Sequence, residues 1–267
     1  MGKRILGAYA ALVYVFLFAP IGVVVVFAFN GGRRFLFWEG FSTKWFGEAL
    51  SDETITEALQ RSVVIALAST GIAIVLGTLL ALALPRMRRV FRVPLDALVY
   101  MTLVTPEIVF GIAALIFFVQ LVDVELGLGT VIVSHAVFNT SVVALIVRAR
   151  FVGMGRDLEE ASYDLGAGPI ATFRQVTLPR LAPAIIAGGL LAFTFSFDDF
   201  ITSNFVTGPG SQTLPMVIFG SVRFGVSPVI NATAAMMLAP TLIAIVVAYV
   251  VLRRSGRVRK EAMLPGV

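Results

Sequence analysis

Residues 159–179, EEASYDLGAGPIATFRQVTLP, form a long polar passage that is punctuated by glycine and ended by a Leu-Pro step. The chain around it is very apolar, with 58% hydrophobic and only 14% charged residues in a length of 267. Such a balance is far from that of a soluble globular domain and predicts an integral membrane protein. The passage is therefore expected to lie outside the lipid, in a loop between two membrane spans.

The first half of the passage has the pattern of a short amphipathic helix. Asp157 is expected as its N-cap, and Glu160 three residues later completes a capping-box-like start with negative charge near the helix N-terminus. Small and apolar residues then share one face of the helix: Leu158, Ala161, Ser162 and Leu165. This face predicts close packing against a neighbour.

The second half predicts a turn followed by another short helix. Gly166 lies where a left-handed residue is needed to end the first helix. Gly168 and Pro169 follow, and proline is favoured in the first turn of a new helix. Pro179 is expected to end this helix, and Pro183 to interrupt the approach to the next span. The alternative is a solvated loop that only links two spans.

Several stretches are long and apolar enough to cross a membrane, because a spanning helix needs about 20 largely apolar residues. Six of them lie near residues 5–29, 60–84, 95–121, 129–149, 183–203 and 231–252. The sequence therefore predicts an all-α polytopic membrane protein with six transmembrane helices. No repeat or low-complexity segment divides the chain, so residues 1–267 are expected to form a single domain.

Lysine and arginine are distributed unevenly between the two sides of this arrangement. Sixteen of the 21 fall on the side that holds both termini and the polar passage. That side is predicted to be cytoplasmic, because basic residues accumulate in cytoplasmic loops, and this placement explains the net charge without nucleic-acid binding. On the other side, residues 41–50 have a helical pattern, and residues 204–230 are expected to form an external loop. The five basic residues on the side opposite the termini are Arg33, Arg34, Lys44, Arg61 and Arg223.

The polar passage resembles a known signature. The sequence Glu160-Ala161-Ser162 is followed after three residues by Gly166, and the passage ends in Leu178-Pro179, which is similar to the EAA motif of type I ABC importer permeases. In that family this loop, here about residues 150–182, forms coupling helices that dock into a groove on a cytoplasmic ATPase. The resemblance implies this role for Glu160, Ala161, Ser162, Gly166, Leu178 and Pro179. Ser162 stands where the family usually has a second alanine, and this exchange of small residues keeps close packing possible.

The resemblance covers nearly the whole chain. It is carried by FSTKWF (41–46), TPEIVFGIA (105–113), FSFDDF (195–200), FVTGPGSQTLP (205–215) and VRFGVSPVINA (222–232). These segments look like the spermidine/putrescine branch of the family, and like the second of its two membrane subunits. The resemblance implies a bacterial inner-membrane complex. Its other members would be a second permease subunit, two copies of an ABC ATPase that bind ATP and magnesium, and an extracytoplasmic substrate-binding protein.

Three carboxylates fall well inside predicted spans, away from their first residues, and an aspartate at the centre of a span costs about 2.5 to 3.5 kcal/mol on translocon scales. Asp198 and Asp199 lie in the outer half of the fifth span, and Glu107 follows Pro106 in the third, where proline is expected to open the helix toward a cavity. A polycation crossing a region of low dielectric needs such negative groups, and Phe195 beside them adds a cation–π surface. These four residues are the predicted substrate pathway.

Neighbouring residues on a helix diverge by about 100°, so Asp198 and Asp199 are not expected to face one path together. One is expected to line it and the other to bond to a neighbouring helix or to the partner permease. In the alternative interpretation, the acids only form interhelical hydrogen bonds. His135, with Asn139 one turn further on, is expected to be a satisfied polar residue inside the bundle.

The residues and motifs that the sequence lacks exclude several classes of binding site and activity. It contains no cysteine and one histidine, which excludes disulfides and clustered thiolate or histidine metal sites. It has no G-x-x-x-x-G-K-[ST] motif, so we expect no bound cofactor and no ATP hydrolysis by this chain. A non-catalytic transport subunit is the predicted function. The alternative is a self-powered secondary transporter or channel for a small cation, in which the acids would relay protons or ions.

Overall fold

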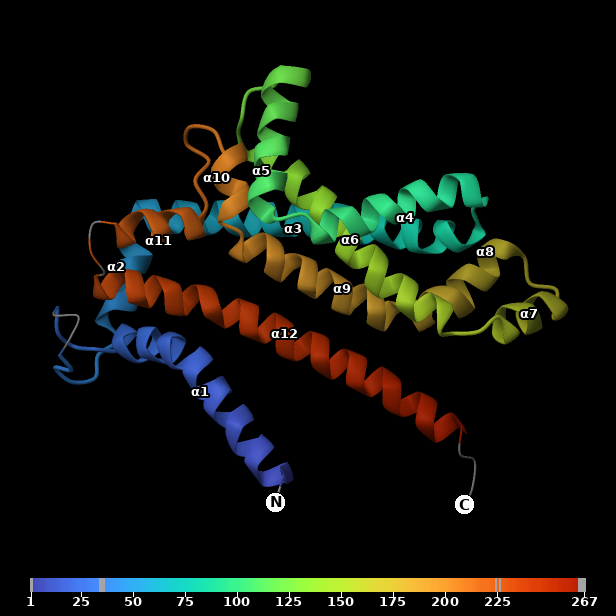
Figure 1. The fold of residues 1–267 in the computed structure, drawn as a ribbon, viewed down its shortest axis with the longest axis horizontal. Helices are drawn as coiled ribbons and strands as arrows, with labels where there is room; N and C mark the ends of the chain where they lie inside the picture. Colours follow the sequence, from blue (N-terminus) through green and yellow to red (C-terminus); the bar gives the residue numbers. More distant parts are fainter. Residues whose placement is uncertain (1, 34–36, 224, 226, 264–267) are drawn as a thin grey trace. The chain divides into compact units, whose positions relative to one another are not determined.

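The computed structural model describes residues 2–33, 37–223, 225 and 227–263, and all regular structure in this part of the chain is helical (Figure 1). Extended pairing among these residues is limited to one isolated bridge between Asn30 and Phe41. The all-α prediction is therefore confirmed. Arg34 of the charge tally, Phe224 and Val226 lie outside the described residues, as do the side chains of Lys3 and of residues 254–260.

Within the described residues, five helical segments are long and apolar enough to span a membrane. They contain α1 (Gly2–Ala28), α3 (Glu53–Ala83), α6 (Leu128–Val152), α9 (Leu178–Asp198) and α12 (Pro228–Met263). A sixth span is counted when α4 (Arg89–Val104) is joined to α5 (Glu107–Ile116) and its π-helical extension η2 (Phe117–Leu121), although the two halves are bent by 114°. The predicted six spans agree with this count only if the bent pair is one span.

Shorter helices fill the connections between the long ones. They are α2 (Lys44–Ser51), η1 (Leu84–Arg86), α7 (Asp157–Asp164), α8 (Pro169–Thr172), the π-helical η3 (Phe173–Thr177), α10 (Ile201–Val206) and α11 (Leu214–Val222). The helical pattern over residues 41–50 is confirmed by α2. The external loop expected over residues 204–230 contains a short helix, α11, which was not expected. Leu214 at the start of α11 is 1% exposed, so burial of this apolar segment outweighs the flanking glycine and proline.

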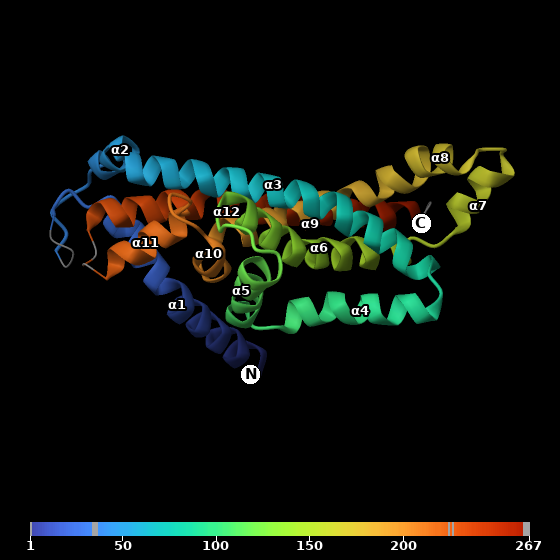
Figure 2. The same cartoon turned by 90° about the horizontal axis from the view of Figure 1, so that it is seen from above.

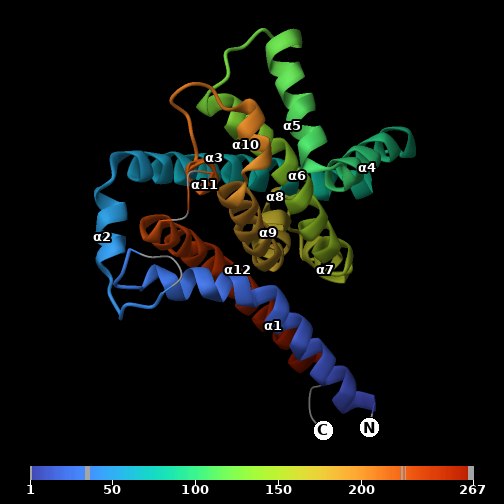
Figure 3. The same ribbon diagram turned by 60° about the vertical axis from the view of Figure 1, so that its left-hand side comes forward.

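The chain divides into two compact units, and the first comprises residues 1–60 and 214–240. In this unit α2 connects the end of α1 to the start of α3 (Figure 3). Its core includes Trp45, whose indole N–H donates a hydrogen bond of 2.6 Å to the carbonyl of Asn30. None of the most apolar window of α1 is buried within the chain. A helix that is apolar and exposed on all sides is suited to a lipid environment.

The second unit, residues 61–213 and 241–267, has α6 at its centre, with 61% of its apolar window buried. α6 packs along α9 and also contacts α4 and α10. A Cβ added at Gly77 of α3 would lie 2.8 Å from the Cβ of Val143 on α6, so glycine is what allows these two helices to approach. Beyond the ends of α6 and α9, α7 and α8 project together at one end of this unit (Figures 1 and 2).

Candidate functional site

The break in the third predicted span exposes a carboxylate. Thr105 is extended, with φ −63° and ψ 128°, because a residue before proline avoids the helical region. α4 therefore ends at Val104, and Glu107 becomes the first residue of α5, where the free N–H groups of the helix favour negative charge. The predicted opening at Pro106 is confirmed. Glu107 is exposed and forms no hydrogen bond or ion pair with the residues that the structure describes.

The fifth predicted span also ends earlier than expected. The prediction of a helix through residue 203 is wrong, because α9 stops at Asp198 and the chain is extended at Asp199. The carboxylate of Asp199 accepts hydrogen bonds from the backbone N–H groups of Thr202 (3.2 Å) and Ser203 (2.7 Å), which belong to the first turn of α10. Aspartate favours such caps over helix interiors, since its side chain competes for backbone donors.

His135 joins these elements from α6. Its Nδ1 lies 2.7 Å from the hydroxyl of Ser196, and its Nε2 lies 3.1 Å from Asp199 Oδ2 and 3.2 Å from the Ser203 hydroxyl. With Asp199 ionised, the ring donates through Nε2–H to the carboxylate and accepts at Nδ1 from Ser196. The expectation that His135 is a satisfied polar residue is confirmed. Its partners lie 61 to 68 residues away along the sequence, and no local pattern could have revealed them.

The cluster combines serine, histidine and aspartate, the residue types of a hydrolytic triad, but here their hydrogen bonds connect neighbouring helices. Ser196 is 5% exposed, and its hydroxyl is held between His135 and the hydroxyl of Ser69, at 2.9 Å. A nucleophile has to reach its substrate, and this hydroxyl is enclosed by its own helices. Within the described residues, no group of three or more histidine, aspartate or glutamate side chains is placed to hold a metal ion.

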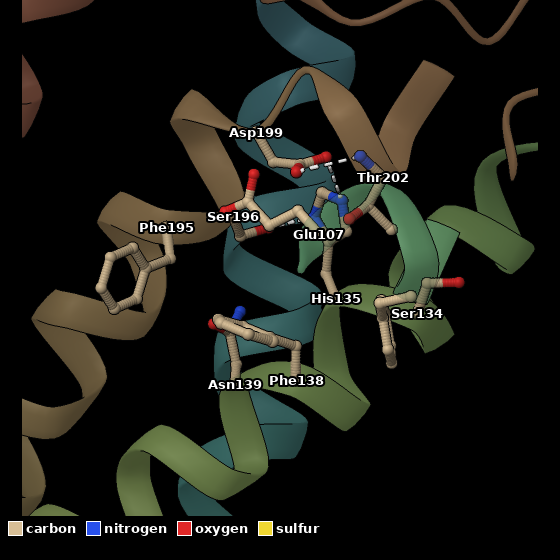
Figure 4. A pocket seen from close by; sticks show the side chains of 10 residues that line it. Glu107, Ser134, His135, Phe138, Asn139, Phe195, Ser196, Asp199 and Thr202 are labelled. Atoms are coloured by element: carbon tan, nitrogen blue, oxygen red, sulfur yellow. Dashed lines mark hydrogen bonds and ion pairs between the residues drawn. The ribbon is translucent and has the colours of Figure 1, made fainter. Parts of the chain in front are cut away.

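The two adjacent aspartates point to different neighbours, as their positions on a helix require. Asp198 accepts from the hydroxyl of Thr241 on α12, with distances of 3.0 and 3.1 Å to its two oxygens. Asp199 instead faces a small pocket (Figure 4). The expected divergence is confirmed, because Asp198 is hydrogen-bonded to a neighbouring helix and Asp199 lines the pocket.

The pocket has a volume of about 30 Å³ and lies among α5, α6, α9 and α10. Three phenylalanine rings form one wall: Phe138 is edge-on to Phe110 at 6.3 Å and to Phe195 at 6.1 Å between ring centroids. Phe195 is 48% exposed. Two carboxylates and three aromatic rings around one cavity are suited to a cation. The full lining is Glu107, Phe110, Ser134, His135, Phe138, Asn139, Phe195, Ser196, Asp199 and Thr202.

The polar passage forms the predicted helix, turn and second helix. Gly166 has φ +82°, and α7 ends in a Schellman motif, with Gly166 N–H donating to the Tyr163 carbonyl (2.9 Å) and Ala167 N–H to the Ser162 carbonyl (3.0 Å). Pro169 is the first residue of α8, as predicted. The capping box is wrong: α7 begins at Asp157 itself, and no side chain caps its N-terminus.

The second helix does not end at Pro179. α8 continues through η3 into α9, so that residues 169–198 form one helical segment with Pro179 in the first turn of α9 and Pro183 inside it. The π-helical turn comes immediately before Leu178. Such a turn adds a residue to a helix without ending it. The extension of α9 therefore connects α8 directly to the membrane span.

Side chains attach α7 to this continuous helix. Glu159 accepts a hydrogen bond of 2.6 Å from the Thr177 hydroxyl and lies 3.7 Å from Arg86 at the end of η1. The hydroxyls of Ser162 and Thr172 are 3.0 Å apart. No residue of α7 is buried, and Glu160 and Ala161 are exposed. α7 is thus held by its inner edge while its outer surface remains open.

A groove of about 690 Å³ lies between α7 and the helical segment that continues α8 through η3 into α9, and it is named the α7–α8 groove. All four residues of the predicted small face line it, together with Val176, Pro179 and others from η3 and α9. Leu165 at its rim is 88% exposed and Ile170 on α8 is 76% exposed. Leu165 lies outside the candidate spans, and an apolar side chain exposed there is suited to a protein-binding surface.

Comparison with known proteins agrees with this arrangement. Residues 73–257 match the family of binding-protein-dependent transport system inner membrane components. The chain belongs to this family. The matched segment of the permease contains both the pocket and the α7–α8 groove.

Two relatives of the permease come from Escherichia coli (strain K12). The putrescine transport system permease protein PotI is 39% identical over 253 residues, which cover 92% of this chain and 90% of the relative. The spermidine/putrescine transport system permease protein PotC is 33% identical over 253 residues, covering 95% and 96% of the two chains.

A solved structure shares the fold of the permease. A chain of a bacterial ABC transporter involved in the import of the acidic polysaccharide alginate matches it with a TM-score of 0.68 and 17% identity, covering 96% of each chain. This similarity bears on the fold alone. It supports the predicted ABC importer permease fold. The family match shows that the permease is a membrane subunit of a transport system.

Proposed function

We propose that the permease forms half of the translocation pathway of an ATP-driven ABC importer for polyamines such as spermidine and putrescine. The observation that carries this proposal is the convergence of Glu107 and Asp199 on one pocket, each at the end of a helix broken within the predicted membrane. Two relatives that align with over nine-tenths of this chain are named as putrescine or spermidine/putrescine permeases, which supports the same substrate class.

The chemistry of the pocket suits a chain of ammonium groups. A cation leaving water needs compensating negative charge, and the interaction of two unit charges at 4 Å rises from about 1 kcal/mol in water to about 4 kcal/mol near a protein surface. Glu107 is free to supply this charge, whereas Asp199 is already bonded to His135. Phe195 offers a half-exposed ring face beside them. Asp198, which is hydrogen-bonded to Thr241 on α12, is the fourth residue of the proposed pathway.

The α7–α8 groove is proposed as the docking surface for the ATPase. Ala161, Ser162 and Pro179 line it, and Glu160, Gly166 and Leu178 adjoin it along the chain. All six would act in docking. ATP and magnesium would be bound by two ATPase copies, and a second permease and an extracytoplasmic binding protein would complete the importer. The unbroken helix from α8 into α9 supports a mechanical connection, because it offers a rigid path from the groove to Asp198.

The proposed orientation places both termini in the cytoplasm of a bacterial cell, with the permease in the inner membrane. The pairing of Arg86 with Glu159 supports it, since it brings the end of α3 and the α7 loop together at one side of the second unit. Arg148 and Asp96 pair near the cytoplasmic ends of α6 and α4. Basic residues thus gather where the positive-inside rule requires them.

Uptake of radiolabelled putrescine by proteoliposomes that hold the complete importer tests the pathway. Asp198→Asn, Asp199→Asn and Glu107→Gln should each lower uptake about tenfold or more while the complex still assembles, since one favourable charge interaction of about 1.4 kcal/mol corresponds to a factor of ten. Glu125→Gln, which removes an exposed carboxylate outside the pocket, is the matched control. Wild-type uptake by all three variants would remove these acids from the path.

The same proteoliposomes test the coupling. Glu160→Lys and Gly166→Pro should abolish ATP-dependent uptake without changing the amount of permease in the membrane. Uptake that persists without the ATPase and follows an imposed proton gradient would instead favour a self-powered transporter or channel.

A further inference from the structure

Asn139 has a buried polar atom that the fold does not satisfy. Its Oδ1 is enclosed and has no hydrogen-bond partner among the described residues, and the whole residue is 1% exposed. An unsatisfied buried acceptor costs about 1–3 kcal/mol, so native proteins rarely keep one without a ligand or water for it. Asn139 follows His135 by one turn of α6 and lines the same pocket as Glu107 (Figure 4).

Two other polar side chains of the pocket, those of Asp199 and Ser196, are already occupied. Asp199 accepts from His135 and from two backbone N–H groups, and the hydroxyl of Ser196 lies between His135 and Ser69. Among the carboxylate and amide side chains that line the pocket, Glu107, which has no hydrogen-bond partner among the described residues, and Asn139 still have an acceptor available. One is charged and one is neutral, and both lack a donor.

The pocket has room for a donor that fits these acceptors. Its volume of about 30 Å³ exceeds the roughly 10–15 Å³ that a single water molecule needs. A primary ammonium group is of similar size and carries three N–H donors. The aromatic wall of Phe110, Phe138 and Phe195 attracts a positive charge but does not stabilise a neutral molecule to the same degree.

We propose that this pocket is a subsite for one terminal primary ammonium group, and that the Oδ1 of Asn139 selects for its N–H donors. This inference rests on the proposed function, because it assigns one end of the transported amine to the pocket. A quaternary ammonium group has no N–H to donate to Asn139 or Glu107. The subsite therefore admits primary amines and rejects fully methylated ones.

Thermal unfolding of the purified complex tests the subsite without any transport step. Methylammonium chloride at increasing concentration should raise the unfolding midpoint of the wild type, because a ligand that binds only the folded state stabilises it. Tetramethylammonium chloride and sodium chloride at the same concentrations should not. In Asn139→Leu the response to methylammonium should be lost, while the midpoint without ligand stays the same or rises, since the unsatisfied acceptor is gone.

Uptake of putrescine by the reconstituted importer gives the second measurement. Asn139→Leu should lower the maximal rate at least tenfold, and Asn139→Asp, which keeps an acceptor oxygen at the same place, should remain within about threefold of the wild type. The matched control is Asn231→Leu, because Asn231 is also buried, with an unsatisfied Nδ2, but lies outside the pocket. It should leave uptake unchanged.

The outcomes separate this inference from the proposed function. The subsite is overturned, leaving only a bound water there, if Asn139→Leu takes up putrescine as the wild type does and if methylammonium and sodium shift the unfolding midpoint equally. Methylammonium stabilisation that depends on Asn139 in a complex that does not transport putrescine keeps the subsite and rejects the polyamine importer. An Asn139→Leu complex that unfolds at a lower temperature than the wild type contradicts the inference, because it shows a structural role.

Discussion

Truncation of Leu165 should weaken the binding of the ATPase without affecting the fold of the permease. This side chain is 88% exposed at the rim of the α7–α8 groove, so its removal costs the isolated chain almost no packing. Leu165→Ala removes about three carbons, each of which contributes about 0.8 kcal/mol when buried, so full burial against a partner corresponds to about 2 kcal/mol. A loss of that size weakens binding about 30-fold, since 1.4 kcal/mol is a factor of ten.

Titration of fluorescently labelled ATPase onto the permease pair in nanodiscs measures this change directly. Leu6→Ala is the matched control, because Leu6 is 69% exposed on α1, outside the groove. The control should bind the ATPase as the wild type does, and both variants should unfold at the wild-type temperature. If Leu165→Ala retains the wild-type dissociation constant within a factor of two, the apolar rim of the groove does not lie in the ATPase interface.

Three further substitutions test the fold and the buried cluster. Gly166→Ala should destabilise the permease by about 1–2 kcal/mol, because alanine is strained at its φ of +82°, whereas Gly168→Ala, with φ −73°, should be neutral. Equal thermal unfolding of this pair would show that the turn tolerates alanine. Gly77→Ala should destabilise by about 1–3 kcal/mol through overpacking against α6. Gly71→Ala on the same helix meets nothing within 4 Å and should stabilise by about 0.5–1 kcal/mol, and the opposite order of their unfolding midpoints would refute the close approach. His135→Leu should cost about 1–3 kcal/mol, because it removes the hydrogen bond that the ring donates to the buried carboxylate of Asp199. Chemical denaturation that gives the wild-type free energy of unfolding would show that this hydrogen bond does not stabilise the fold.

The sequence was sufficient for elements whose cause is local. The turn at Gly166 and the start of α8 at Pro169 follow from backbone preferences of single residues, and both were predicted. The break at Pro106 has the same origin, although its angle of 114° depends on how α5 packs against α10. The five unbroken spans follow from hydrophobic length, whereas the sixth is counted only if the bent pair of α4 and α5 is one span.

Features that depend on tertiary contacts could not be predicted. Pro179 was expected to end a helix, but a π-helical turn before it allows the helix to continue. Asp199 was placed inside a span, but its carboxylate caps α10 and thereby ends α9. The role of Glu159, between Arg86 and Thr177, depends on three segments that meet only in the folded chain.

The central claim is that the α7–α8 loop is seated in a partner ATPase. The chain contains no cysteine, so Leu165→Cys introduces a unique attachment point for a short photoreactive maleimide on the rim of the groove. Irradiation of the assembled, transporting complex should crosslink the permease to the ATPase subunit in high yield, and the same probe on Leu6→Cys should not. A complex that retains ATP-dependent uptake but gives no ATPase adduct from residue 165 would contradict the docking of this loop.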